Sequence, residues 1–128
     1  MDIVTKMQLN ILIQLAKADK HFAKAERDMI FKLAKDKNFS EEEVVALIKN
    51  PEPINSLGAL SGEQKLNYLY ACMDLIRVDN KIFDSELTFC KSIAIKLGFK
   101  KNVVDFLIDN FDKKLSEDTK KAVLTDFM

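Results

Sequence analysis

Four carboxylates stand at two matching points of the chain. Glu26 follows Asp19 at the same interval at which Glu86 follows Asp79. Carboxylate oxygens are the ligands that hard divalent cations such as calcium and magnesium take in proteins. If both points lie at one end of the fold, these four side chains predict a site there for a metal ion or a partner.

The same carboxylates also fit a structural role, which is the interpretation that the sequence favours. Each glutamate falls in the first turn of a predicted helix, where it can complete a capping box. Each aspartate ends the preceding helix, where it can accept hydrogen bonds from turn N–H groups. Metal or partner binding is the alternative, and an EF-hand is excluded because its loop spreads the ligands over about twelve positions.

Little else in the sequence indicates catalysis. His21 is the only histidine, and we expect it to be a solvated loop residue rather than a metal ligand. The chain has no glycine-rich phosphate loop and no serine or cysteine motif paired with a base. We therefore expect a protein that is not an enzyme and has no cofactor, apart from calcium or magnesium if the four carboxylates bind an ion.

Composition indicates one globular domain, residues 1–128. A chain of this length buries about two thirds of its unfolded surface. Its 20 basic and 20 acidic side chains cancel, so no overall positive field attracts nucleic acid or an anionic membrane. With no signal peptide and no apolar run approaching about 18 residues, we expect no membrane insertion and a cytoplasmic location.

Two cysteines, Cys72 and Cys90, lie within apolar helical runs. Their spacing is not that of a zinc site, and two cysteines make no disulfide framework. We expect buried free thiols, with a disulfide between the two as the alternative.

The chain repeats itself without a gap when it is shifted by 60 residues, the offset between Asp19 and Asp79. Further identical pairs at this offset are Leu9 and Leu69, Leu15 and Leu75, Ala34 and Ala94, Phe39 and Phe99, Val44 and Val104, Leu47 and Leu107, Ile48 and Ile108, and Asn50 and Asn110. These are mostly positions that packing and helix ends restrict. We expect two pseudo-symmetric halves, about 5–50 and 61–111, with a connector at about 51–60 and a C-terminal helix at about 116–127.

Apolar periodicity is helical throughout, and no stretch alternates as a strand does. The expected fold is therefore an all-α bundle of about seven to eight helices. Ser40 and Ser61 begin capping boxes, and Asn38 and Gly98 occupy matching slots where a helix ends in a left-handed residue. The helices at 2–18 and 61–78 have the widest apolar arcs, so we expect them to pack against each other at the centre.

The element at the two helix junctions is typical of a known family. It comprises Ala18-Asp19, Phe22 and Glu26 in the first half, Val78-Asp79, Ile82 and Glu86 in the second, and Asn50-Pro51 after the third helix. Over roughly residues 5–110 this pattern resembles the TerB-like domain of bacterial tellurite-resistance and related stress proteins. The resemblance implies an all-helical domain of two halves and a non-enzymatic interaction module, with protein partners, in tellurite, metal or envelope stress. The alternative is a protein that binds a divalent metal ion or a small ligand through the acidic residues of the junctions.

Overall fold

The computed structural model describes residues 3–18, 24–54, 57–78, 84–110 and 117–128. Within these ranges the chain forms helices and no strand, which confirms the predicted all-α class. The described helices are α1 (Ile3–Ala16), α2 (Lys24–Asp36), α3 (Glu41–Lys49), α4 (Gly62–Arg77), α5 (Asp84–Leu97), α6 (Val103–Asn110) and α7 (Glu117–Asp126).

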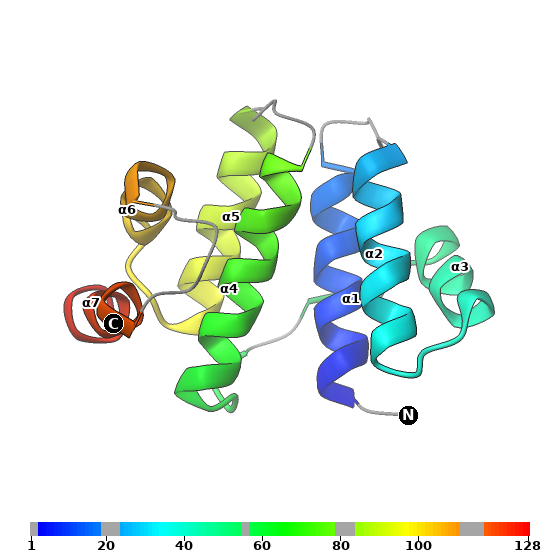
Figure 1. Cartoon of the computed structure of the whole chain (residues 1–128), viewed down its shortest axis with the longest axis horizontal. Coiled ribbons are helices and arrows are strands. Elements are labelled where there is room, and N and C mark those ends of the chain that lie inside the picture. The colour runs from blue at the N-terminus through cyan, green and yellow to red at the C-terminus, as the bar shows by residue number, and fades with distance from the viewer. Residues whose placement is uncertain (1–2, 19–23, 55–56, 79–83, 111–116) are drawn as a thin grey trace.

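The helices form two groups that meet at α1 and α4. In Figure 1, α1, α2 and α3 make one side of the molecule and α4 to α7 make the other. α1 packs on α4, and each of them also contacts the second helix of the opposite group. Fully buried side chains line this contact, among them Leu9, Leu12 and Leu15 from α1 and Leu69, Met73 and Ile76 from α4. The predicted central pair is therefore confirmed, and burial of this apolar area is the main contribution to stability.

Both predicted capping boxes are present. The Ser40 hydroxyl accepts a hydrogen bond from the Glu43 N–H at 3.2 Å, and Glu43 Oε1 accepts one from the Ser40 N–H at 3.4 Å. The same exchange links Ser61 and Gln64 at 3.1 and 2.9 Å. These bonds satisfy N–H groups that have no partner inside the helix, so α3 and α4 begin where the sequence places them.

Two helix ends also match their prediction. Asn38 and Gly98, which follow α2 and α5, have φ angles of 61° and 98°. The left-handed turn lets the next N–H reach back, so Phe39 N–H donates to Ala34 O at 2.8 Å and Phe99 N–H donates to Ala94 O at 2.9 Å. Each turn places its phenylalanine in the core.

The helix bounds agree with the predicted repeat. Shifted by 60 residues, α1, α2 and α3 would span 63–76, 84–96 and 101–109, and α4, α5 and α6 span 62–77, 84–97 and 103–110. The larger of the two shifted starts, that of α6, has a physical reason, because the position equivalent to Ser40 is Lys100, whose side chain has no oxygen to accept from the first turn. α6 therefore begins at Val103 rather than at 101. Duplication of the two halves stays a prediction.

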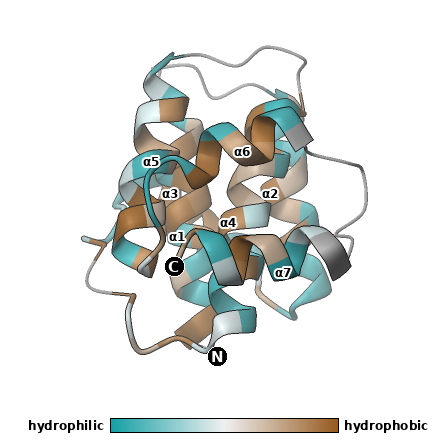
Figure 2. Cartoon of the chain, turned by 90° about the vertical axis from the view of Figure 1, so that its left-hand side faces the viewer, coloured by the Kyte–Doolittle hydropathy of each residue, from teal (hydrophilic) through white to brown (hydrophobic). Residues whose placement is uncertain are grey.

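α7 packs beside α6 on the side seen in Figure 2. Val123 is fully buried, and the rings of Phe106 and Phe127 lie 4.8 Å apart between centroids. The Lys100 N–H donates to the Phe127 carbonyl at 2.6 Å. Leu124, the next residue after Val123, is 38% exposed.

A search of the described ranges for a membrane-crossing helix finds none that is both long and apolar enough.

Candidate functional site

The acidic end of the bundle is the end at which α1 and α4 finish and α2 and α5 begin (Figure 1). Glu26 and Glu86 each occupy the first turn of their helix there. Both glutamates are only 2% exposed. Asp19, Asp79 and His21, the other candidates at this end, lie outside the described residues.

Burial of two glutamates is unusual, because an ionised carboxylate loses its hydration in the interior. Their position in a first turn compensates in part, since the helix N-terminus carries a partial positive charge. A complete capping box needs a side-chain oxygen on the residue before the helix. Ala23 precedes α2 and Phe83 precedes α5, and neither has one. The capping interpretation therefore differs here from the complete boxes of α3 and α4.

Metal binding at this end would need ligands beyond the two glutamates. In the part of the chain that the structure describes, no group of three or more His, Cys, Asp or Glu side chains could hold a metal ion. The carboxylates of Glu26 and Glu86 suit a hard divalent cation. A site of the predicted kind would draw its further ligands from Asp19 and Asp79.

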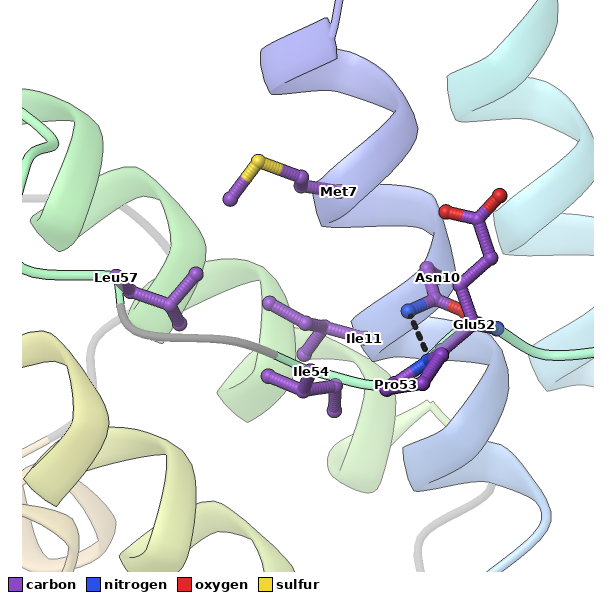
Figure 3. Close-up of a pocket in the computed structure, with 7 residues that line it drawn as sticks. All are labelled: Met7, Asn10, Ile11, Glu52, Pro53, Ile54 and Leu57. Atoms are coloured by element: carbon purple, nitrogen blue, oxygen red, sulfur yellow. Dashed lines mark hydrogen bonds between the residues drawn. The ribbon is translucent and has the colours of Figure 1, made fainter.

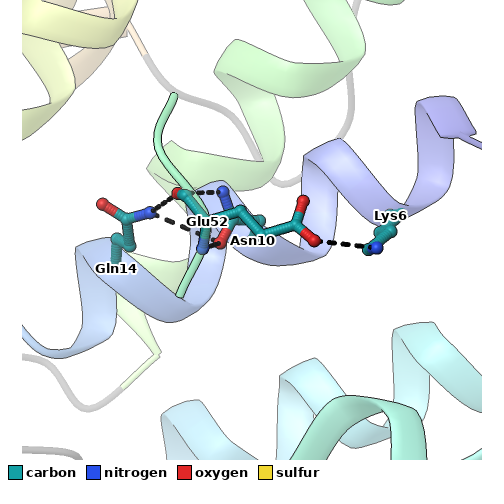
Figure 4. A network of polar contacts seen from close by, with 4 residues as sticks. All are labelled: Lys6, Asn10, Gln14 and Glu52. Atoms are coloured by element: carbon teal, nitrogen blue, oxygen red, sulfur yellow. Dashed lines mark hydrogen bonds and ion pairs between the residues drawn. The ribbon is translucent and has the colours of Figure 1, made fainter. Parts of the chain in front are cut away.

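A second candidate lies where the connector crosses α1, and Figure 4 shows its polar contacts. The Asn10 side chain donates from Nδ2 to the Glu52 carbonyl at 2.8 Å, and its Oδ1 accepts from the Glu52 N–H at 2.9 Å. Gln14 Nε2 donates to the same carbonyl at 2.6 Å, and Lys6 pairs with the Glu52 carboxylate at 2.8 Å. Asn10 thus binds both backbone groups of one residue, as a neighbouring strand would.

The sequence analysis did not identify this network. Asn10 stands between Leu9 and Ile11 in a helix of wide apolar arc, and it is only 4% exposed. A buried amide needs hydrogen-bond partners, so a lone asparagine within such an arc indicates that some backbone crosses there. That signal was present in the sequence, but the identity of the partner was not.

Among the hollows that the described residues form, three lie along α1, α2, α3 and the connector. The connector hollow has a volume of about 250 Å³ and is lined by Met7, Asn10, Ile11, Glu52, Pro53, Ile54 and Leu57 (Figure 3). The α3 hollow, of about 310 Å³, is lined by Lys6, Phe39, Glu43, Ala46, Leu47, Asn50 and Glu52. The α2 hollow, of about 440 Å³, is lined by Phe31, Lys32, Ala34, Lys35, Phe39 and Glu41. The first two share Glu52 and the last two share Phe39, so the three adjoin.

The walls of these hollows combine apolar floors with charged rims. In Figure 3, the side chains of Met7, Ile11, Ile54 and Leu57 gather around the connector hollow, with the Asn10–Glu52 pair beside it. The row carries positive charge from Lys6, Lys32 and Lys35 and negative charge from Glu41, Glu43 and Glu52. Such a lining suits binding of an apolar anchor with polar groups around it, rather than bond-breaking chemistry.

Titratable groups with shifted pKa values lie in the other half, on α4 and α5. Burial raises the pKa of Tyr70 to about 12. Burial also raises the pKa of Asp74, and the nearby Arg77 lowers it in part. The pKa of the Cys90 thiol is raised by a hydrogen bond with Cys72, by burial and by the charge of Glu86.

Comparison with protein-family models, with curated proteins and with solved structures finds no match to this chain.

Proposed function

We propose that this chain is a non-enzymatic interaction module, acting through a protein partner in the response to tellurite, metal or envelope stress. The resemblance to TerB-like domains supplies the process. The observation that best supports a protein partner is the row of three adjoining hollows along α2, α3 and the connector.

Protein partners commonly anchor themselves by a few side chains placed in such hollows. The shared residues Phe39 and Glu52 connect the hollows, so one bound segment can use more than one of them. Charges of both signs along the row favour a partner that carries complementary charges and disfavour one of uniform charge.

Substitution of Ala46 by arginine tests this proposal. Ala46 is exposed on α3 and lines the α3 hollow, so a long charged side chain would fill the hollow without disturbing the core. The matched control is Ile95→Arg, which places the same side chain on α5 at a position that is 58% exposed. Both variants should melt at the temperature of the native chain, because exposed substitutions change stability by no more than about 0.5 kcal/mol.

Immobilised native chain and the two variants are then compared for the proteins that they retain from a lysate of the source cells. We expect a protein that the native chain and Ile95→Arg retain and Ala46→Arg loses. Retention of the same proteins by all three, or the loss of a protein only with Ile95→Arg, would exclude the row of hollows as the binding surface.

Binding of a divalent cation at the acidic end is the second candidate, and the burial of Glu26 and Glu86 favours it. Calcium and magnesium prefer the oxygen ligands that these carboxylates supply. A small ion can also reach buried carboxylates more readily than the surface of a partner protein can.

Thermal melts with millimolar calcium or magnesium test this candidate. A ligand that binds only the folded state stabilises it by RT ln(1 + [L]/Kd), about 2.7 kcal/mol at a hundredfold excess over Kd. We expect a modest rise in melting temperature for the native chain and none for the Glu26→Gln, Glu86→Gln double variant. Glu63→Gln, in the exposed first turn of α4, is the matched control and should keep the rise. A flat response in the native chain would return both glutamates to helix capping.

A further inference from the structure

A docking surface for a helix exists in the second half of the molecule, where α7 covers it. The ring of Phe127 lies 4.8 Å from that of Phe106 between centroids, and the Lys100 N–H donates to the Phe127 carbonyl at 2.6 Å. At the start of α4, a Cβ added to Gly62 would lie 3.7 Å from Leu124 Cδ2. α7 therefore lies against both α6 and the start of α4.

The α3 hollow occupies the equivalent place in the first half. Most of its wall comes from α1, α3 and the turn before α3, which correspond at the 60-residue offset to α4, α6 and the turn before α6. The lining residues Lys6, Phe39, Glu43, Ala46 and Leu47 correspond in this way to Leu66, Phe99, Val103, Phe106 and Leu107. α3 and α7 lie on opposite sides of the molecule (Figure 1). The α3 hollow is thus the first-half counterpart of the surface that α7 covers.

Exposure differs between the two surfaces at matched positions. Leu66 and Val103 are 2% and 0% exposed in the second half. Their counterparts reach solvent, because the Lys6 side chain is 34% exposed and Glu43 is only partly buried. The first half therefore leaves open a face that the second half buries.

Differences between matched residues indicate which side chains the α3 hollow accepts. Ala46 stands where Phe106 supplies a ring. The missing ring leaves a hollow of about 310 Å³ with Phe39 and Leu47 in its wall, which a large apolar side chain of a partner can fill.

Glu43 gives the hollow a preference for charge. Its Oε1 accepts hydrogen bonds from Ser40, whereas its Oε2 is shielded from water and accepts none from the described residues. Lys6, the lysine among the lining residues, is already paired with Glu52 at 2.8 Å. The carboxylates of Glu43 and Glu52 outnumber this lysine, so the hollow is negative and favours a lysine or arginine of the partner over an acidic side chain.

We propose that the α3 hollow binds an amphipathic helix of the partner protein, as the equivalent surface binds α7. A large apolar side chain of that helix lies over Ala46, and a lysine or arginine one turn away donates to the Glu43 carboxylate. α7 of a second copy suits the hollow less well, because Asp126 stands beside its anchor Phe127. This inference rests on the proposed function for the existence of a partner, and it adds the chemistry by which that partner is recognised.

A phage library of helical peptides is the probe that tests the proposal. It is selected on immobilised native chain, and the retained sequences are synthesised and titrated against the full chain by calorimetry. We expect them to share a large apolar residue with a lysine or arginine three or four positions away. Ala46→Phe supplies the missing ring, and Glu43→Gln removes the charge but keeps the oxygen that the capping box needs. Each variant should raise the Kd by at least about tenfold.

Ile95→Phe and Glu42→Gln are the matched controls and should keep the native Kd, since both positions are exposed and neither lines the hollow. A library that yields no retained sequence, or a Kd that Ala46→Phe or Glu43→Gln leaves unchanged, would overturn the proposal. So would a dimer of the native chain that Ala46→Phe dissociates in sedimentation, because the occupant would then be a second copy.

The lysate comparison separates this inference from the proposed function. If Ala46→Arg loses a cell protein but the selected peptides lack the basic residue, the row of hollows keeps its role and only the basic helix is excluded. If Ala46→Arg retains every protein that the native chain retains, the proposed function fails, whatever the peptides do.

Discussion

At the scale of single residues, Asn10 has the most specific role in the described chain. Its amide binds the N–H and the carbonyl of Glu52, and it thereby holds the connector on α1. Asn10→Ala leaves both backbone groups of Glu52 without this partner in a partly buried place. We expect the free energy of unfolding to fall by about 1–3 kcal/mol, which urea denaturation followed by circular dichroism would measure.

Two further variants show how much of this loss of stability comes from the Asn10 amide rather than from nearby groups. Asn10→Asp keeps an oxygen for the Glu52 N–H but loses the donor, so its loss should be comparable to or larger than that of alanine because a charge is also buried. Lys6→Ala removes only a partly exposed ion pair and should change stability by no more than about 1 kcal/mol. An equal loss of stability for Lys6→Ala and Asn10→Ala would mean that the hydrogen bonds of Asn10 to the Glu52 backbone stabilise the fold no more than the Lys6–Glu52 ion pair does.

The fold shifts the titration of the Tyr70 hydroxyl. Burial raises its pKa from 10.0 to about 12. The folded chain then binds this proton more tightly than the unfolded chain, so the stabilisation is complete below pH 10.0 and is lost as the pH rises towards about 12. Alkali should therefore destabilise the native chain more than Tyr70→Phe over that interval.

Absorbance can follow this group directly. The chain has two tyrosines and no tryptophan, so Tyr68→Phe leaves Tyr70 as the only tyrosine. Its ionisation midpoint should lie well above that of the same variant in urea, where the ordinary value near 10.0 applies. Identical midpoints in the folded and unfolded chain would contradict the burial effect.

At the scale of elements, the left-handed ends of α2 and α5 offer a matched pair of substitutions. Gly98 has φ 98°, where a side chain is strained, although the nearest atom to an added Cβ, Lys65 Nζ, is 3.7 Å away. Gly98→Ala should therefore destabilise by about 1–2 kcal/mol through backbone strain alone. Asn38→Gly relieves a φ of 61° at the equivalent end and should be neutral or slightly stabilising.

Differential melting of the two variants against the native chain gives the sign of each change. A stabilising effect of Gly98→Ala would show that the turn after α5 does not need a left-handed residue. A loss with Asn38→Gly as large as with Gly98→Ala would show that the asparagine side chain, and not only its backbone, supports the end of α2.

Local signals in the sequence explain most of the elements. Capping boxes at Ser40 and Ser61, left-handed slots at Asn38 and Gly98 and helical periodicity each act within one or two turns, so they can be read without knowing the fold. α6 begins two residues later than a shift of α3 by 60 would place it, because Lys100 cannot cap a helix as Ser40 does. A repeat predicts the number of elements better than it predicts their bounds.

The candidate sites depend on contacts between distant parts of the chain, which the sequence shows less well. Glu26 and Glu86 were identified from their spacing, but their burial follows from packing around the helix starts and could not be inferred. Asn10 and Glu52 are 42 positions apart, and no local pattern joins them.

At the scale of the whole molecule, both halves share one core through α1 and α4. Leu15 and Leu75 occupy equivalent places in these helices, and both are 0% exposed. Leu15→Ala and Leu75→Ala should each lower the free energy of unfolding by about 2–5 kcal/mol, because each removes packed methyl groups and leaves a cavity. Urea denaturation followed by circular dichroism would measure both losses.

A core shared by both halves should make the whole chain unfold in a single transition. If α1 and α4 stabilise each other, damage on either side should move the unfolding of the whole chain, and a single transition should persist in both variants. Ile95→Ala, at an exposed position on α5, is the matched control and should change stability by less than about 0.5 kcal/mol. Hydrogen exchange can then compare the amides of α2 with those of α5 in each variant. If Leu15→Ala weakened protection only in α1 to α3, and Leu75→Ala only in α4 to α7, the two halves would be independent folding units and the central contact would be an interface rather than a core.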